Sequence, residues 1–152
     1  MHSRSVTLGV AALLTSWLAG CGGEPIDEAG AKALWERIHA EGYQTWARAP
    51  GWESRQPTVS VHGQTADIFV NDAVVSALGA QGQAAWPVNA LFVKDGYESD
   101  ALAVVAAMEK RESGWYFAEW DSAGKAKFAG SPSVCLDCHQ AAPDFVFSTV
   151  PP

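Results

Sequence analysis

Residues 88–128 read VNALFVKDGYESDALAVVAAMEKRESGWYFAEWDSAGKAKF, and this stretch decides the fold that the sequence predicts. Residues 88–97 are typical of a strand that runs into an Asp95-Gly96 turn. Residues 114–128 predict a strand, a turn at DSAGK and a second short strand. Between them, ALAVVAAMEK is rich in alanine and valine and fits either a helix or a strand. The stretch therefore predicts mainly antiparallel strands.

Helical patterns lie before this stretch. Residues 27–50 predict an N-terminal helix, because apolar residues recur there at helical spacing. Residues 61–72, VHGQTADIFVND, predict a strand interrupted by Gly63. Asn71 is placed to cap a short helix over residues 72–80. The order predicts an α+β domain: a mainly antiparallel β-sheet with an N-terminal helix, a short inserted helix and a C-terminal turn that carries a cysteine motif.

The bulk composition fits one globular domain. The chain has 152 residues, of which 48% are hydrophobic, and its seven tryptophans predict an aromatic-rich core or pocket. The formal net charge is −7, and the few basic residues are scattered along the chain. Nucleic acid is therefore not an expected partner, since binding phosphates needs clustered positive charge.

The N-terminus is typical of an export signal. Arg4 lies in a short basic region, and the apolar stretch from Val6 to Leu18 is too short for a typical membrane span. The sequence Leu18-Ala19-Gly20-Cys21 resembles a bacterial lipobox, whose cysteine receives lipid and becomes the new N-terminus. An ordinary signal peptide cut nearby, with an incidental cysteine, is the alternative.

These features predict the organisation of the chain. We expect residues 1–20 to be a lipoprotein signal peptide, residues 21–30 a tether and residues 31–152 a single domain. The prediction places the protein outside the bacterial cytoplasm, at the periplasmic face of a membrane, anchored through lipid on Cys21.

Near the C-terminus, residues 133–147 read SVCLDCHQAAPDFVF. Cys135 and Cys138 lie one helical turn apart and His139 follows directly, the pattern that attaches haem c through two thioethers and places an axial histidine under the iron. A redox-active dithiol is a poorer interpretation so close to the chain end. Structural zinc needs about four ligands, and only His39 or His62 could complete the set. We therefore predict one covalent haem c with His139 as proximal ligand.

Four segments together resemble the cytochrome P-460 and β-sheet cytochrome c′ family: VHGQTADIFVNDAVVSAL, WPVNALFVKDG, MEKRESGWYFAEW and CLDCHQAAPDFVF. They span roughly residues 57–147. The resemblance implies a small antiparallel sheet, a homodimer, and haem c bound by His139 with an open or labile distal site. Enzymes of the family oxidise hydroxylamine or related compounds and carry a lysine crosslinked to the haem edge. The cytochrome c′-like members bind NO or CO beneath an apolar, often phenylalanine-lined cap.

Few residues could serve as a sixth ligand to the iron. Met108 lies in an apolar stretch, where core packing is its expected role. His39 lies on the predicted N-terminal helix. His62 either faces the haem or hydrogen-bonds the backbone near Gly63, and we favour the structural role. We therefore expect a five-coordinate iron or one with exchangeable water.

Lys94 falls at the family position of the crosslinked lysine. In a strand, Phe92 and Lys94 point to one face, while Leu91, Val93 and Asp95 point to the other. A lysine near a buried haem edge is desolvated and more nucleophilic, whereas a lysine at a strand end before a turn is usually solvated. Both interpretations remain open.

Ala106 falls about where the enzymes carry a distal acid. In a strand, Leu102, Val104, Ala106 and Met108 share one apolar face. The side chains expected to line the distal site are Phe69, Phe92, Phe117, Ala106 and His62. A pocket without an acid favours neutral diatomic ligands over hydroxylamine turnover.

The preferred hypothesis is an exported mono-haem cytochrome c that binds NO or CO on an open iron. The alternatives are a hydroxylamine or nitrogen-oxide oxidoreductase of the cytochrome P-460 type, with a Lys94–haem crosslink, and an electron-transfer cytochrome with its own redox partner.

Overall fold

The computed structural model describes residues 24–80 and 85–149, so the predicted signal peptide and Cys21 lie outside the described residues. No helix within these ranges is both long and apolar enough to cross a membrane.

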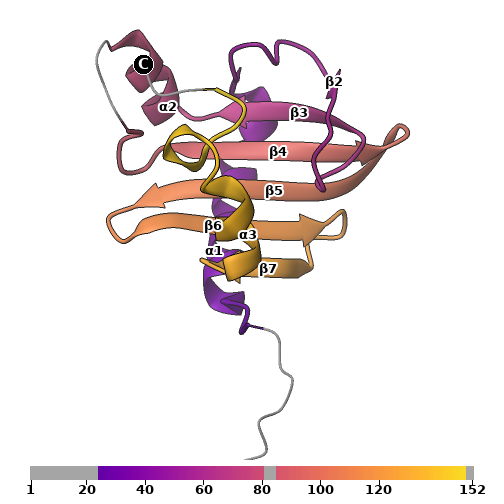
Figure 1. Cartoon of the computed structure of the whole chain (residues 1–152). Helices are drawn as coiled ribbons and strands as arrows, with labels where there is room; N and C mark the ends of the chain where they lie inside the picture. The colour runs from indigo at the N-terminus through magenta and orange to yellow at the C-terminus, as the bar shows by residue number, and fades with distance from the viewer. Residues whose placement is uncertain (1–23, 81–84, 150–152) are drawn as a thin grey trace, which may run out of the picture.

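The described chain forms one antiparallel, seven-stranded sheet with three α-helices, which confirms the predicted α+β class (Figure 1). The strands pair in the order β1-β3-β4-β5-β6-β7, and β2 also pairs with β3. The strands are β1 Ala47–Arg48, β2 Gln56–Pro57, β3 Thr65–Val70, β4 Leu91–Glu98, β5 Ala101–Arg111, β6 Gly114–Asp121 and β7 Ala126–Gly130. The helices are α1 Glu28–Ala40, α2 Asp72–Gly79 and α3 Ser133–His139, with short 3-10 helices η1 Tyr43–Thr45 and η2 Pro143–Phe145.

The N-terminal helix is shorter than predicted. α1 starts where the Asp27 carboxylate accepts a hydrogen bond from the Gly30 amide, and it ends at Ala40 rather than continuing to residue 50. Gly42 then takes a left-handed conformation with φ of 63°, which stops the helix and turns the chain toward β1. The inserted helix α2 forms as predicted, with the Asn71 side chain capping the Val74 amide.

The predicted turn at Asp95-Gly96 is wrong, because β4 continues through both residues to Glu98. Asp95 is fully buried, and its carboxylate accepts hydrogen bonds from the Tyr43 hydroxyl at 2.8 Å and the Gln44 side chain at 3.0 Å. The strand bulges between Gly96 and Tyr97, and the chain reverses only after Glu98. The ambiguous segment ALAVVAAMEK is strand, because β5 pairs along its length with β4 and β6.

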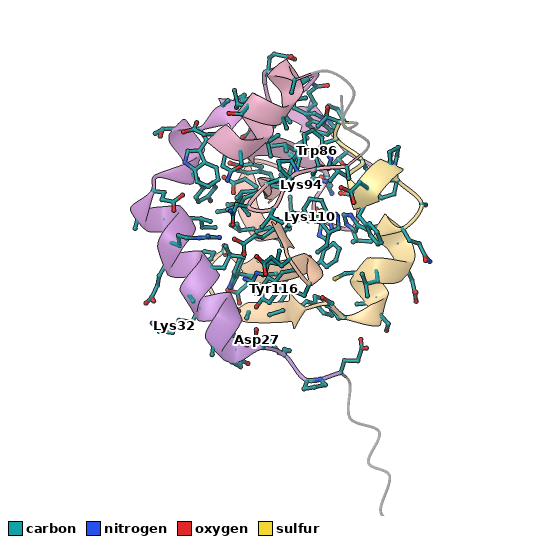
Figure 2. The ribbon with its side chains drawn as sticks, turned by 90° about the vertical axis from the view of Figure 1, so that its left-hand side faces the viewer. Asp27, Lys32, Trp86, Lys94, Lys110 and Tyr116 are labelled. Carbon is teal, nitrogen blue, oxygen red and sulfur yellow. The ribbon has the colours of Figure 1, made fainter. Side chains whose placement is uncertain are left out.

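The sheet carries a separate core on each face, with α1 packed on one and α3 on the other (Figure 2). The α1-side core consists of Ala31, Leu34, Ile38, Tyr43, Phe69, Leu91, Val93, Val105, Ala107, Tyr116, Ala118, Trp120 and Ala129. The α3-side core consists of Ala49, Ile68, Val70, Val74, Ala77, Trp86, Ala90, Phe92, Trp115, Phe117 and Val146. Cys135 and Leu136 pack against the α3-side core, so the cysteine motif lies over this face of the sheet.

Gly96 is needed where the loop before β3 crosses β4. A Cβ at this position would overlap the carbonyl oxygen of His62. We therefore expect Gly96→Ala to lower the free energy of unfolding by about 1–3 kcal/mol, measured by urea denaturation, since the backbone has to move to make room. Gly79→Ala is the control, because nothing lies within 4 Å of a Cβ there. Equal stability of the two variants would contradict this close approach.

Candidate functional site

Helix α3 places the cysteine motif over the sheet. Its first turn is capped by the Glu24 carboxylate, which accepts hydrogen bonds from the Ser133 amide at 2.8 Å and hydroxyl at 3.0 Å. Cys135 packs partly buried toward the sheet, and burial raises the pKa of its thiol to about 11. Cys138, one turn later, is exposed, and both thiols are free. The two sulfurs are therefore available for covalent attachment.

His139, the last residue of α3, has one ring nitrogen fixed by the backbone. Its Nδ1 donates to the carbonyl oxygen of Phe145 at 2.8 Å, which leaves the Nε2 lone pair available to a metal. Burial lowers the pKa of this imidazole, which favours the neutral form that ligates iron. The ring lies 5.2 Å from the ring of Phe117 on β6.

Beneath α3, the sheet presents two rows of side chains aligned across its strands. Directly paired residues in antiparallel strands share a face, so the register defines each row. The first row contains Ile68, Lys94, Ala106 and Glu119. The second row contains Val70, Phe92, Met108 and Phe117. The first row is therefore polar at two of its positions, and the second is wholly apolar.

Lys94 lies on the α3 face, as the strand alternation predicts, and it is partly buried (Figure 2). Its Nζ donates to the Ser60 hydroxyl at 2.8 Å, and no carboxylate pairs with it among the described residues. Burial lowers the pKa of this amine to about 8. Of the two interpretations of Lys94, the structure therefore favours the desolvated amine, which has a larger neutral fraction than a solvated lysine.

The expectation of an acid-free face is wrong. Glu119, on β6 directly opposite Ala106, points its carboxylate into the same row. It accepts a hydrogen bond from His62 Nδ1 at 2.7 Å, and both side chains are largely buried, 22% exposed for His62 and 15% for Glu119. The His62 ring lies 6.5 Å from the His139 ring, so the imidazole–carboxylate pair borders the site.

A sequence signal for Glu119 existed. Along WYFAEW, the residues at even positions, Tyr116, Ala118 and Trp120, enter the α1-side core, while Trp115 and Phe117 enter the α3-side core. A single glutamate inside this apolar alternation has to point toward the α3 face. Only the register with β5 shows that it lies next to Ala106.

One predicted lining residue, Phe69, and one residue predicted to share the face of Ala106, Leu102, belong to the opposite face. Phe69 packs against Tyr43 in the α1-side core, with ring centroids 5.8 Å apart, which removes it from the site. Leu102 also packs against that core, because the bulge in the β4–β5 pairing reverses its face. Phe92, Phe117, Ala106 and Met108 do lie on the α3 face. His39 bonds the Trp35 carbonyl on α1, on the far side of the sheet from α3.

The residues beneath α3 fit a haem better than a metal ion alone. No group of three or more His, Cys, Asp or Glu side chains is arranged to hold a metal ion within residues 24–80 and 85–149, so zinc gains no ligand set there. Trp86 in the α3-side core is 2% exposed, and its Nε1 donor meets no acceptor in the described part of the chain. The core that holds this donor also packs against Cys135, and His139 at the end of the same motif keeps one ring nitrogen free. An apolar core with an unpaired donor suits a group with both apolar and acidic parts, as haem has.

Comparison with known proteins gives one family. The family model described as Cytochrome P460 matches residues 40–148, which includes β3 to β7, α3 and the row that contains Lys94 and Glu119. No curated protein matched the chain.

The buried amine of Lys94 predicts an unusual pH dependence of its chemistry. Because burial disfavours the ammonium form, the neutral amine predominates above a pH of about 8, instead of about 10.4 for an ordinary lysine. In folded protein prepared without haem, we expect acylation of Lys94, followed by peptide mass spectrometry, to rise through this lower midpoint. A profile that coincides with the exposed lysines of the same sample would contradict the placement of Lys94.

Proposed function

Because the chain belongs to the cytochrome P460 family and is thus a haem cytochrome, we propose that it uses one covalent haem c to oxidise hydroxylamine or a related small nitrogen compound. The observation that carries the proposal is a shared sheet face: Lys94 and Glu119 lie in one row beneath the helix of His139, and His62 is hydrogen-bonded to Glu119. This arrangement supplies the buried amine and the acid that the oxidising members of the family need.

The C-terminal residues would hold the haem. Cys135 and Cys138 would form the thioethers, and His139 would offer Nε2 to the iron while its Nδ1 donates to the Phe145 carbonyl. When bound, the haem iron supplies the coordination position for the nitrogen compound and the route by which its electrons leave. Neither His39 nor Met108 is proposed as a sixth ligand to the iron. His39 lies on the other side of the sheet, and Met108 packs in the apolar second row.

Glu119 and His62 handle protons in this proposal. Oxidation of hydroxylamine to NO or N2O releases protons and electrons in equal number, so the protons need an acceptor as the electrons pass to an external one-electron acceptor. The Glu119 carboxylate takes the proton, and His62, hydrogen-bonded at 2.7 Å and more exposed than Glu119, passes it toward solvent. Ala106, which pairs with both Lys94 and Glu119 across the strands, leaves room for this carboxylate from the neighbouring strand.

Lys94 is the residue that we propose to bond to the haem edge, as the family resemblance implies. Its desolvated amine is a competent nucleophile near neutral pH. In forming the carbon–nitrogen bond, a hydrogen leaves each partner as a proton and the electron pair passes to an external oxidant. Ser60 accepts a hydrogen bond from Nζ at 2.8 Å and so holds the amine in place.

Binding of NO or CO is the second candidate function. It is favoured by the apolar second row, in which Phe92, Met108 and Phe117 lie side by side across three strands. A neutral diatomic ligand needs no proton acceptor, so this function would make Glu119 dispensable. For either function we propose an exported protein anchored through Cys21 and acting as a homodimer.

Covalent haem attachment is tested by removing the two motif thiols. We expect Cys135→Ala with Cys138→Ala to abolish haem staining on a denaturing gel, because no thioether can then form. Cys21→Ala is the matched control, since it removes the one remaining cysteine of the chain and should leave the stain intact. Stain that survives the double substitution would contradict the attachment site.

The role of Glu119 is tested by Glu119→Gln, which keeps the shape of the side chain and removes its basicity. We expect hydroxylamine oxidation to slow by about 10²–10⁴-fold, the usual contribution of a general base, with the haem spectrum unchanged. Glu112→Gln, in the exposed β5–β6 turn, is the control and should keep the wild-type rate. Wild-type protein that binds NO reversibly but never turns over hydroxylamine would instead establish gas binding.

A further inference from the structure

Asp144, in η2 after the haem motif, collects hydrogen bonds from three separate parts of the sheet side. Its Oδ2 accepts from the Trp86 backbone amide at 2.7 Å. Its Oδ1 accepts from Lys110 Nζ on β5 at 2.7 Å and from Trp115 Nε1 on β6 at 3.1 Å. The side chain is only 10% exposed. One buried carboxylate therefore fastens the C-terminal segment to two strands and to the loop before β4.

The backbone around Asp144 is unusual. Asp144 and Phe145 follow one another with φ of 40° and 66°, both in the left-handed region that residues with a side chain seldom adopt. Such a conformation persists only where surrounding contacts impose it. The three hydrogen bonds to the Asp144 carboxylate are contacts of this kind, and Val146, buried in the α3-side core, holds the chain on the other side.

This strained pair determines where the Phe145 carbonyl points. That carbonyl accepts from His139 Nδ1 at 2.8 Å, six residues back along the chain. The chain of contacts thus runs from the sheet, through the Asp144 carboxylate and the Phe145 peptide, to the imidazole ring. A hydrogen bond at Nδ1 fixes the tautomer of a metal-binding histidine, orients its ring and makes its other nitrogen more basic.

We infer that Asp144 is a positioning residue for the axial histidine: by holding the Phe145 carbonyl against His139 Nδ1, it sets the strength of the iron–histidine bond and the haem potential. The inference rests on the proposed ligation of haem by His139. Asp144 acts through the Phe145 peptide, since its carboxylate bonds Trp86, Lys110 and Trp115 while the hydrogen bond to His139 comes from Phe145. Losing the Nδ1 hydrogen bond makes the imidazole a weaker donor, which weakens its bond to iron and favours the reduced state.

The test uses haem-loaded Asp144→Ala and Asp144→Asn. The readouts are the iron–histidine stretching band of the reduced protein in resonance Raman spectra and the midpoint potential. We expect Asp144→Ala to lower the frequency of the band and raise the potential. Asp144→Asn keeps an oxygen for the Trp86 amide and should show smaller shifts of the same sign.

Asp137→Ala and Asp137→Asn are the matched controls. Asp137 is an exposed acid on α3, whose carboxylate forms no hydrogen bond within the described residues. Replacing it removes the same charge from the same segment. Its variants should keep the wild-type Raman band. If Asp144→Ala does not fold, the test compares the Raman band and the midpoint potential of Asp144→Asn with those of Asp137→Asn.

Two results would overturn the inference. Asp144 variants that lose thermal stability, yet keep the wild-type Raman band and the potential of the Asp137 variants, would reduce Asp144 to a structural anchor. A wild-type protein with no iron–histidine band would overturn the axial role of His139 and this inference together. Loss of hydroxylamine turnover alone, with the band shift present in Asp144→Ala, would refute the proposed reaction and leave the inference standing.

Discussion

The register of β4, β5 and β6 is the constraint on which the site depends. It places Lys94, Ala106 and Glu119 directly opposite one another on three neighbouring strands. Side chains paired in this way lie within about 5.5 Å of each other at Cβ, so an amine and a carboxylate come to flank one small residue. A shift of any one of these strands by a single position would turn its side chain in the row to the other face and destroy the row. The chemistry proposed here is therefore a property of strand pairing more than of any one loop.

Period-two alternation makes β4 serve both faces of the sheet. Lys94 enters the α3 face, while the next residue, Asp95, is buried on the α1 face with hydrogen bonds from Tyr43 and Gln44. A strand with polar groups buried on both faces forgoes apolar contacts. On the α1 face each oxygen of the Asp95 carboxylate accepts a hydrogen bond, whereas on the α3 face the Lys94 amine has only the Ser60 hydroxyl as an acceptor among the described residues. The cysteine motif therefore covers the face on which the buried polar group of β4 has fewer hydrogen-bond partners.

The local patterns in the sequence predicted much of this arrangement. The α+β class, the Asn71 cap of α2 and the orientation of Phe92 and Lys94 follow from spacing along one segment, and the structure agrees with them. Errors arose where contacts distant in sequence decide the outcome. Tyr43 and Gln44 stabilise Asp95 inside a strand that reads as a turn, and the β4–β5 bulge sends Leu102 to the opposite face. The sequence does not show that Glu119 lies opposite Ala106, because the cross-strand register cannot be read from either strand alone.

The proposed oxidation depends most on Lys94 lying at the edge of the haem and bonding to it. Proteolytic digestion of the haem-loaded protein and mass spectrometry of the haem-containing fragments test it most directly. We expect a fragment in which the peptide of Lys94 and the peptide of Cys135 and Cys138 are joined through one haem, with no cleavage after Lys94. Recovery of the Lys94 peptide unmodified, with the haem attached to the cysteine peptide alone, would contradict it.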